Sequence, residues 1–175
     1  SLLSILNKCD TAIGRRLCKN RLLYPILDVN KLKDRYDMIE NFQKDYLYNL
    51  LKPSLKKILD VEKLHRRMGL NLLSPYEFFS IHTSYNYLIK IVECINKSLP
   101  QVCEKYKNTI ESLDKFMQEY HSVFQIDELE KYSLTNMISS VFQKGIYNDL
   151  DELQDSINKG YDDILLFCNG LNKYI

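Results

Sequence analysis

The chain has 175 residues, of which 45% are hydrophobic and 27% are charged, with only 5 glycines and 4 prolines. This length and composition indicate one domain, or one domain with a projecting arm, and they disfavour a turn-rich β protein. The net charge of +1 conceals an asymmetry, because residues 1–70 hold 15 basic and 8 acidic side chains whereas residues 71–175 hold 9 and 15. The basic half could face nucleic acid or an acidic partner domain, or it could be an ordinary solvated face.

The cysteine pattern and the lengths of the apolar runs indicate an intracellular protein without a membrane span. Cysteines occur at five scattered positions without a C-x-x-C pair or a metal-ligand spacing: Cys9, Cys18, Cys94, Cys103 and Cys168. We therefore expect reduced thiols, most of them in the core of an intracellular protein. No apolar run reaches the roughly 18 residues of a membrane span, and residues 1–10 do not resemble a signal peptide.

The first half of the chain is predicted to be a series of short helices. Thr11 or Asp10 can cap a helix that Pro25 stops, with Gly14 inside it at a cost of about 1 kcal/mol relative to alanine. The pattern places Gly14 and Cys18 on a packed face, together with Ile13, Leu17 and Leu22, and leaves Arg21 on that arc without an evident partner.

Three further capped segments follow in this half. Asp28 should cap a helix that runs to about Gln43. A helix over residues 45–59 is interrupted at Pro53, which could instead begin a second helix. Asp60 should cap a helix over residues 61–68.

The second half has more regular periodicity. Ser74, Pro75 and Glu77 form a helix-start signal with a capping box. Two apolar stripes follow, on either side of a turn at Pro100, and their spacing predicts an antiparallel helical hairpin. The stripes are Phe78, Ile81, Tyr85, Leu88, Val92, Ile95 and Leu99, then Tyr106, Ile110, Leu113, Met117, Tyr120 and Phe124.

The last segments complete an all-α prediction. We expect a short helix over residues 126–132, a strand or loop over residues 137–143, and a long helix from about Asn148 whose side chain could cap it. Its apolar stripe extends to the last residue: Leu150, Leu153, Ile157, Tyr161, Ile164, Cys168, Leu171 and Ile175. The predicted organisation is a helical domain over residues 1–147 and a long helical arm over residues 148–175, within a fragment of a larger protein.

Several kinds of chemistry are excluded by spacing. No two glycines fit a G-x-x-x-x-G-K-[ST] loop or a G-x-G-x-x-G turn, so neither nucleotide-binding motif is present. His65, His82 and His121 are far apart and belong to no H-x-x-x-H pair, so surface or half-buried histidines are favoured over metal ligands. Acidic pairs such as Asp162 and Asp163 fit solvated faces better than acid–base catalysis. We expect no catalytic residue, cofactor site or metal site.

The basic residues allow weak phosphate contacts. The candidates are Arg15, Lys19, Lys56, Lys57 and Arg66. They lack interleaved aromatic residues and a recognition-helix turn, so salt bridges between helices are the competing interpretation.

Three blocks of residues, in order along the chain, resemble the MutS family of DNA mismatch-repair proteins, in its core or lever domain (domain III) with the start of the clamp helix. The first block is Thr11, Gly14, Arg16, Leu17, Leu22, Pro25 and Asp28, continued by Leu32, Arg35 and Glu40. The second is Asp60, Val61, Glu62, Leu64, Arg67, Ser74 and Pro75. The third is Lys144, Gly145, Asp149, Leu150, Asp151, Glu152 and Leu153. Arg21 stands where the family usually has tryptophan, and Cys18 replaces an aliphatic residue.

The resemblance implies a mechanical role. In this family, other domains probe mismatched DNA and hydrolyse ATP with Mg²⁺, and the lever connects the ATPase domain to a clamp that closes over DNA. The chain would then be a non-enzymatic connector. Its partners would be the other domains of a parent that binds mismatched double-stranded DNA and dimerises.

Two alternatives remain open from the sequence. One is a stand-alone helical module that binds a protein partner through the hairpin or the last helix. The other is direct nucleic-acid binding by the basic half, which predicts an affinity that falls steeply with salt.

Overall fold

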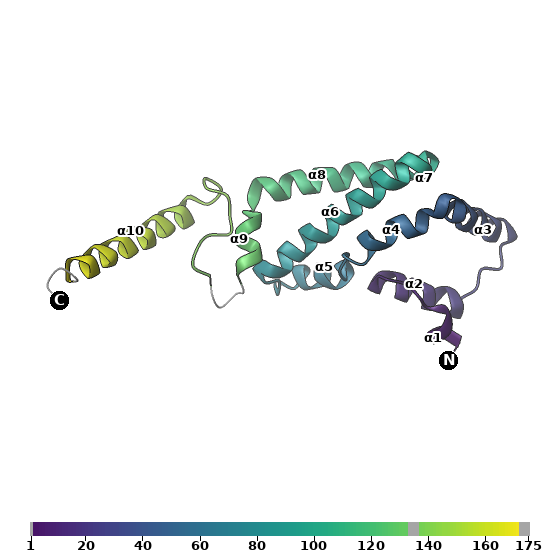
Figure 1. Ribbon diagram of the computed structural model, residues 1–175, viewed down its shortest axis with the longest axis horizontal. Helices are drawn as coiled ribbons and strands as arrows, with labels where there is room; N and C mark the ends of the chain where they lie inside the picture. The colour runs from purple at the N-terminus through teal and green to yellow at the C-terminus, as the bar shows by residue number, and fades with distance from the viewer. Residues whose placement is uncertain (1, 133–136, 172–175) are drawn as a thin grey trace. The chain divides into compact units, whose positions relative to one another are not determined.

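The computed structural model describes residues 2–132 and 137–171, and within them it contains helices and no strand (Figure 1). The all-α prediction is therefore confirmed. The helices are α1 (Leu2–Leu6), α2 (Ala12–Leu23), α3 (Val29–Gln43), the 3₁₀ turn η1 (Lys44–Tyr46), α4 (Leu47–Leu55), α5 (Val61–Gly69), α6 (Pro75–Ser98), α7 (Pro100–Lys105), α8 (Lys107–Val123), α9 (Ile126–Lys131) and α10 (Asn148–Leu171).

The chain forms two compact units. Unit 1 comprises Ser1–Leu73 and Glu77–Met117, and unit 2 comprises Ser74–Tyr76 and Gln118–Ile175. The predicted organisation into a helical domain over residues 1–147 and an arm over residues 148–175 stays a prediction. Within residues 2–132 and 137–171, every helix is too short or too polar for a membrane span.

Capping side chains start three helices of unit 1 where the sequence predicts them. Thr11 Oγ1 accepts a hydrogen bond from the Gly14 amide at 3.0 Å, and the Asp28 side chain accepts from the amides of residues 30 and 31. Asp60 accepts from the Lys63 amide at 3.2 Å. These bonds satisfy amides that have no partner within the helix, which is why the helices begin there.

Helix α2 differs from its predicted packing. It contains no fully buried residue, and Leu17 and Leu22 of its apolar arc are exposed. Arg21 is also exposed, so its place on this arc needs no acidic partner.

The prediction that Pro53 starts or separates a helix is wrong. Pro53 lies inside α4, with Leu47 and Leu51 buried one turn apart before it. Burying each leucine stabilises the helix by about 2 kcal/mol, and the two together outweigh the roughly 3 kcal/mol that an interior proline costs. Instead, the chain bends ahead of α4, where η1 ends at Tyr46 in the left-handed conformation (φ 54°).

Two small buried clusters hold unit 1 together. In the first, Leu47 and Leu51 of α4 pack with Ile91 of α6 and with Leu99, which precedes α7. In the second, Leu64 of α5 packs with Leu73 and Ile81. Helix α6 contributes to both clusters, so it is the element on which α4 and α5 are assembled.

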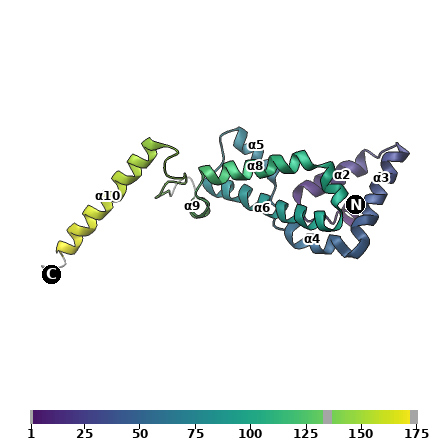
Figure 2. The same ribbon diagram turned by 90° about the horizontal axis from the view of Figure 1, so that it is seen from above.

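The predicted helical hairpin is present, with an extra break. Helices α6 and α8 run in opposite directions and are joined by α7, which the sequence analysis did not separate from α8 (Figures 1 and 2). The rings of Tyr85 and Phe116 meet edge to face at 5.5 Å, and the Cys103 thiol donates to the Val92 carbonyl.

Unit 2 contains a short extended pairing and a long helix. Residues 123–125 and 141–143 pair through Gln125 N to Val141 O and Gln143 N to Val123 O, both 2.8 Å, with a single bridge between Phe124 and Phe142. This bridge is what the predicted strand or loop over residues 137–143 forms. Helix α10 begins at Asn148, as predicted, and Asn148 is its first helical residue.

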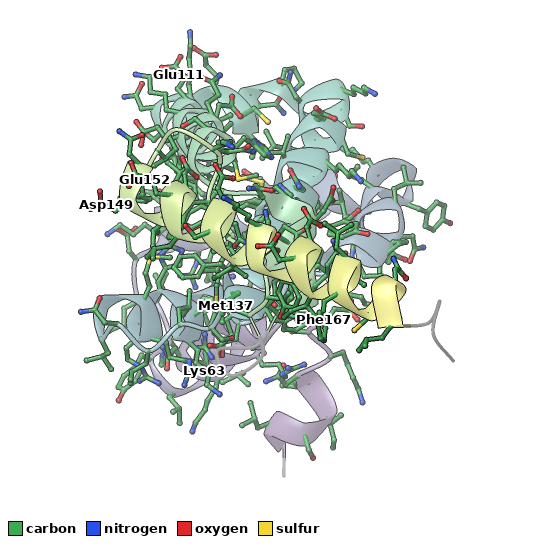
Figure 3. All side chains as sticks on the ribbon, turned by 90° about the vertical axis from the view of Figure 1, so that its left-hand side faces the viewer. Lys63, Glu111, Met137, Asp149, Glu152 and Phe167 are labelled. Atoms are coloured by element: carbon green, nitrogen blue, oxygen red, sulfur yellow. The ribbon has the colours of Figure 1, made fainter. Side chains whose placement is uncertain are left out.

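The apolar stripe of α10 is exposed along its whole described length. Its large side chains are between 40% and 61% exposed, and Figure 3 labels Asp149 and Glu152 at the start of the helix and Phe167 near its end. The stripe comprises Leu150, Leu153, Ile157, Tyr161, Ile164, Cys168 and Leu171, while the predicted last member, Ile175, lies outside the described residues.

The glycine inside α2 yields a testable prediction. A Cβ on Gly14 would lie 2.9 Å from Thr11 Oγ1 and 3.3 Å from Cys9 Cβ, so the close neighbour is the preceding segment and not another helix. We expect Gly14→Ala to lower the free energy of unfolding by about 1–2 kcal/mol, because the capping bond is displaced.

The matched control is Gly69→Ala, since a Cβ at this helical glycine of the same unit meets nothing within 4 Å. It should raise the free energy of unfolding by up to about 1 kcal/mol through helix propensity. Urea unfolding curves of the two variants check the prediction, and shifts of the same sign would contradict it.

Candidate functional site

An ionic joint connects α2 to α5, although its residues lie 44 to 46 positions apart. Arg16 Nη1 and Nη2 donate to the two carboxylate oxygens of Asp60, each at 2.7 Å, and Nη2 also pairs with Glu62. We call these three residues the Arg16 joint. The bidentate geometry fixes the orientation of the guanidinium plane, which a single contact would leave free.

The electrostatics of the joint centre on Asp60. The hydrogen bonds from Arg16, together with the Lys63 amide, lower the pKa of the Asp60 carboxyl to about 2. The same hydrogen bonds raise the pKa of the Arg16 guanidinium. One carboxylate thus caps α5 and holds α2, so losing its charge would loosen both contacts.

A second ionic contact fixes the end of α5 to the start of α6. The Arg67 guanidinium donates to the Leu72 carbonyl at 2.8 Å, and its Nε lies 2.8 Å from Glu77 Oε1. This pairing was missed by the sequence analysis, which assigned Glu77 to a capping box. Separation by ten residues across a turn gives no periodic signal.

In unit 2, the third motif block builds the start of α10. Gly145 has φ 91°, a left-handed conformation that favours glycine, and its amide donates to Asp151 Oδ2 at 2.7 Å. Lys144 pairs with Asp155 at 3.4 Å. Asp151 therefore fixes the turn that leads into the helix, while Leu150 and Leu153 face outward.

The other predicted residues are not brought together into a site. Arg15 donates to the carbonyls of Cys9 and Asp10, both at 3.4 Å. Leu17 and Pro25 are exposed, and Arg35 is half-buried on α3. Glu152 accepts from the Ser156 hydroxyl through its carbonyl.

The remaining phosphate candidates, Lys19, Lys56, Lys57 and Arg66, are exposed on α2, around the end of α4 and on α5. Phosphate contact by them stays a prediction. Within residues 2–132 and 137–171, no group of three or more His, Cys, Asp or Glu side chains could hold a metal ion.

The hairpin carries an apolar groove that the periodicity did not predict, because the two stripes were expected to close on each other. The groove has a volume of about 480 Å³. Its lining is largely apolar and comes from α6, α7 and α8, including Tyr85, Leu88, Val92, Ile95, Val102, Tyr106, Ile110, Leu113 and Phe116. Its chemistry suits an apolar partner surface and not a reaction.

The Arg16 joint predicts a specific loss of stability. Arg16→Gln should lower the melting temperature of the chain, because Asp60 and Glu62 then lose their shared partner. Lys19→Gln removes the same charge from an exposed position of the same helix and should leave the melting temperature nearly unchanged. Thermal unfolding followed by circular dichroism makes the comparison, and equal shifts would count against the joint.

The depressed pKa of Asp60 predicts a pH window. Because the folded-state pKa of about 2 lies below the ordinary value of 3.8, the stabilisation is complete above about pH 4 and is lost as pH falls through about 2. The difference in melting temperature between the parent chain and Asp60→Asn should therefore shrink as pH falls from 4 to 2. Asp37→Asn, an exposed carboxylate on α3, provides the control. A difference that stays constant with pH would refute this assignment.

Comparison with known proteins shows which family this chain matches. Residues 1–166 match the family model of MutS domain III. A putative DNA mismatch repair protein of Acanthamoeba polyphaga mimivirus, a MutS homologue, is 31% identical over 167 residues, which cover 90% of this chain and 14% of that protein. The DNA mismatch repair proteins MutS of Alkaliphilus metalliredigens and Clostridioides difficile are 27% and 25% identical over 161 residues, or 91% of this chain.

The matched relatives are much longer than this chain, which spans 14% to 18% of their length. The match nevertheless runs from α1 into the last turns of α10. It includes the Arg16 joint and the ion pair between Arg67 and Glu77. The chain belongs to the MutS family of DNA mismatch repair proteins, as its domain III.

Proposed function

We propose that this chain is the helical connector of a MutS-like mismatch repair protein, coupling a clamp on mismatched DNA to an ATPase domain. The observation that carries the proposal is the family match over residues 1–166. The relatives are named DNA mismatch repair proteins, so DNA is the partner we infer for the parent. ATP and Mg²⁺ would be bound by its other domains, and the parent would dimerise.

The physical properties of the chain suit a mechanical role. Helix α10 has 24 residues and so extends about 36 Å. Its exposed apolar stripe needs covering by another surface, as expected of an arm that continues into a clamp. At the other end of the chain, the Arg16 joint holds α2 against α5, so a displacement of one helix is passed to the other.

We infer that the chain itself is not an enzyme. In the Arg16 joint the polar side chains form ion pairs and a helix cap, which position the backbone and leave no reactive group free there. In the proposed parent protein, the connector transmits a displacement, and the other domains bind mismatched DNA and hydrolyse ATP.

The apolar groove of the hairpin supports one alternative, a helical module that binds a protein partner independently of mismatch repair. Sequencing the gene on both sides of the segment that encodes residues 1–175 separates the two proposals. A downstream G-x-x-x-x-G-K-[ST] loop in the same reading frame supports the connector, whereas a stop codon directly after Ile175 would eliminate it.

A kink in α10 tests the coupling directly. Gly160 lies within α10, and a Cβ placed there meets nothing within 4 Å. Proline at this position removes a backbone hydrogen bond and clashes with the preceding turn, so Gly160→Pro should break the rigid arm without disturbing a contact. In the full-length protein, we expect it to lower the stimulation of ATP hydrolysis by mismatched DNA at least tenfold, on the order of 1.4 kcal/mol of coupling.

The control is Gly160→Ala, which keeps the helix continuous and should preserve the stimulation. Basal ATP hydrolysis should be the same in both variants, because the substitution is remote from the nucleotide site. Steady-state ATPase assays with and without mismatched duplex provide the measurement. Normal stimulation in Gly160→Pro would show that α10 does not carry the coupling.

A further inference from the structure

The segment before α2 contains Cys9, which lies against the face of α2 that carries Cys18. A Cβ built on Gly14 would lie 3.3 Å from Cys9 Cβ and 3.7 Å from Cys9 Sγ, so Cys9 occupies the space that this glycine leaves open. Cys18 follows Gly14 by four residues and therefore lies on the same face of α2, one turn later. Side chains on a helix lean toward its N-terminus, so the Cys18 thiol is directed toward the position of Cys9.

Both thiols lie against the same face of α2 and are reduced. Both side chains are half-buried, and neither forms a disulfide. A hydrogen bond from the Cys9 thiol to Cys18 contributes, after burial, to raising the pKa of the Cys9 thiol. The contact is local to unit 1 and involves no other cysteine of the described chain.

Backbone contacts fix Cys9 in this place. Arg15 Nη1 donates to the Cys9 carbonyl and the Asp10 carbonyl, and Asn7 Nδ2 donates to the Arg15 carbonyl at 3.1 Å. These bonds tie the segment to the first turns of α2 from both sides. The thiols are therefore held near each other by the fold and do not depend on a chance approach of a free loop.

We propose that Cys9 and Cys18 form a site of reversible disulfide formation, with a low-molecular-weight disulfide such as glutathione disulfide as the oxidant. In the first step a Cys18 thiolate attacks glutathione disulfide, which releases one glutathione thiolate and leaves a mixed disulfide on Cys18. In the second step the Cys9 thiolate attacks the Cys18 sulfur and expels the second glutathione. The two protein thiols lose two electrons and two protons, and glutathione disulfide becomes two glutathione molecules.

The bond would lock the start of α2. It closes a loop of ten residues, from Cys9 to Cys18, around the Thr11 cap and Gly14. Arg16 lies about 200° around the helix from Cys18, so the bond acts on the face opposite the Arg16 joint. Oxidation therefore restrains the face of α2 that the ion pairs leave unrestrained.

Peptide mapping of the full chain provides the test. Trypsin separates Cys9–Arg15 from Leu17–Lys19, so a disulfide between them joins two peptides that are otherwise released singly. The chain is equilibrated in glutathione buffers of rising oxidised fraction, alkylated, digested without reductant and analysed by mass spectrometry. We expect the linked peptide to be at least about tenfold more abundant from the folded chain than from the same chain in 8 M urea, because the fold raises the effective thiol concentration.

Two variants sharpen the result. In Cys9→Ala the linked peptide should be absent and the Cys18 peptide should carry glutathione instead. In Cys168→Ala, which removes an exposed cysteine on α10, the yield should be unchanged. Equal yields from folded and unfolded chain, or glutathione on both cysteines of the folded wild-type chain without any linked peptide, would overturn the proposal. The comparison of the folded and urea-unfolded wild-type chain tests the proposal even where a variant fails to fold.

Discussion

The arrangement of the N-terminal half of unit 1 depends on the Asp60 carboxylate. It accepts the Lys63 amide and so starts α5, and it accepts two hydrogen bonds from Arg16 and so attaches α2. Helix α2 has no fully buried residue, so apolar packing alone does not fix its position. A single surface ion pair contributes little to the stability of a fold. A bidentate pair that shares a helix cap also fixes the orientation of the two groups. The joint matters because it sets orientation where the core does not.

The buried core of the chain is small and distributed, which leaves large apolar surfaces uncovered. The two clusters of unit 1 rest on α6, and neither includes a residue of α2 or contains a fully buried residue of α3. The hairpin groove and the stripe of α10 present further apolar area to solvent. Exposed apolar patches of this extent mark contact surfaces. In a chain that spans 14% to 18% of its matched relatives, the remaining length of a parent protein could supply those contacts.

Local signals in the sequence predicted more than long-range ones. The caps at Thr11, Asp28 and Asp60 were predictable because a side chain and the amides it binds lie within three residues of each other. The proline rule failed at Pro53 because burial of the preceding leucines outweighs it. The partners of Arg16 and Arg67 could not be derived from periodicity, since each lies on a different helix. The resemblance placed Arg16 in the first motif block and Asp60 and Glu62 in the second, and the structure shows the contact between them.

The two faces of α2 connect the ionic joint to the thiol pair. Successive residues turn by about 100° along a helix, so Arg16 lies opposite both Gly14 and Cys18. On one face, Thr11 and Cys9 approach Gly14 so closely that a Cβ there would be crowded, and on the other face Arg16 reaches α5. A helix held on both faces can move only with its neighbours, which is the property that the proposed connector role requires. A disulfide at Cys9 and Cys18 would strengthen one of these restraints without touching the other, so oxidation would change the stiffness of α2 while the ion pairs kept its orientation.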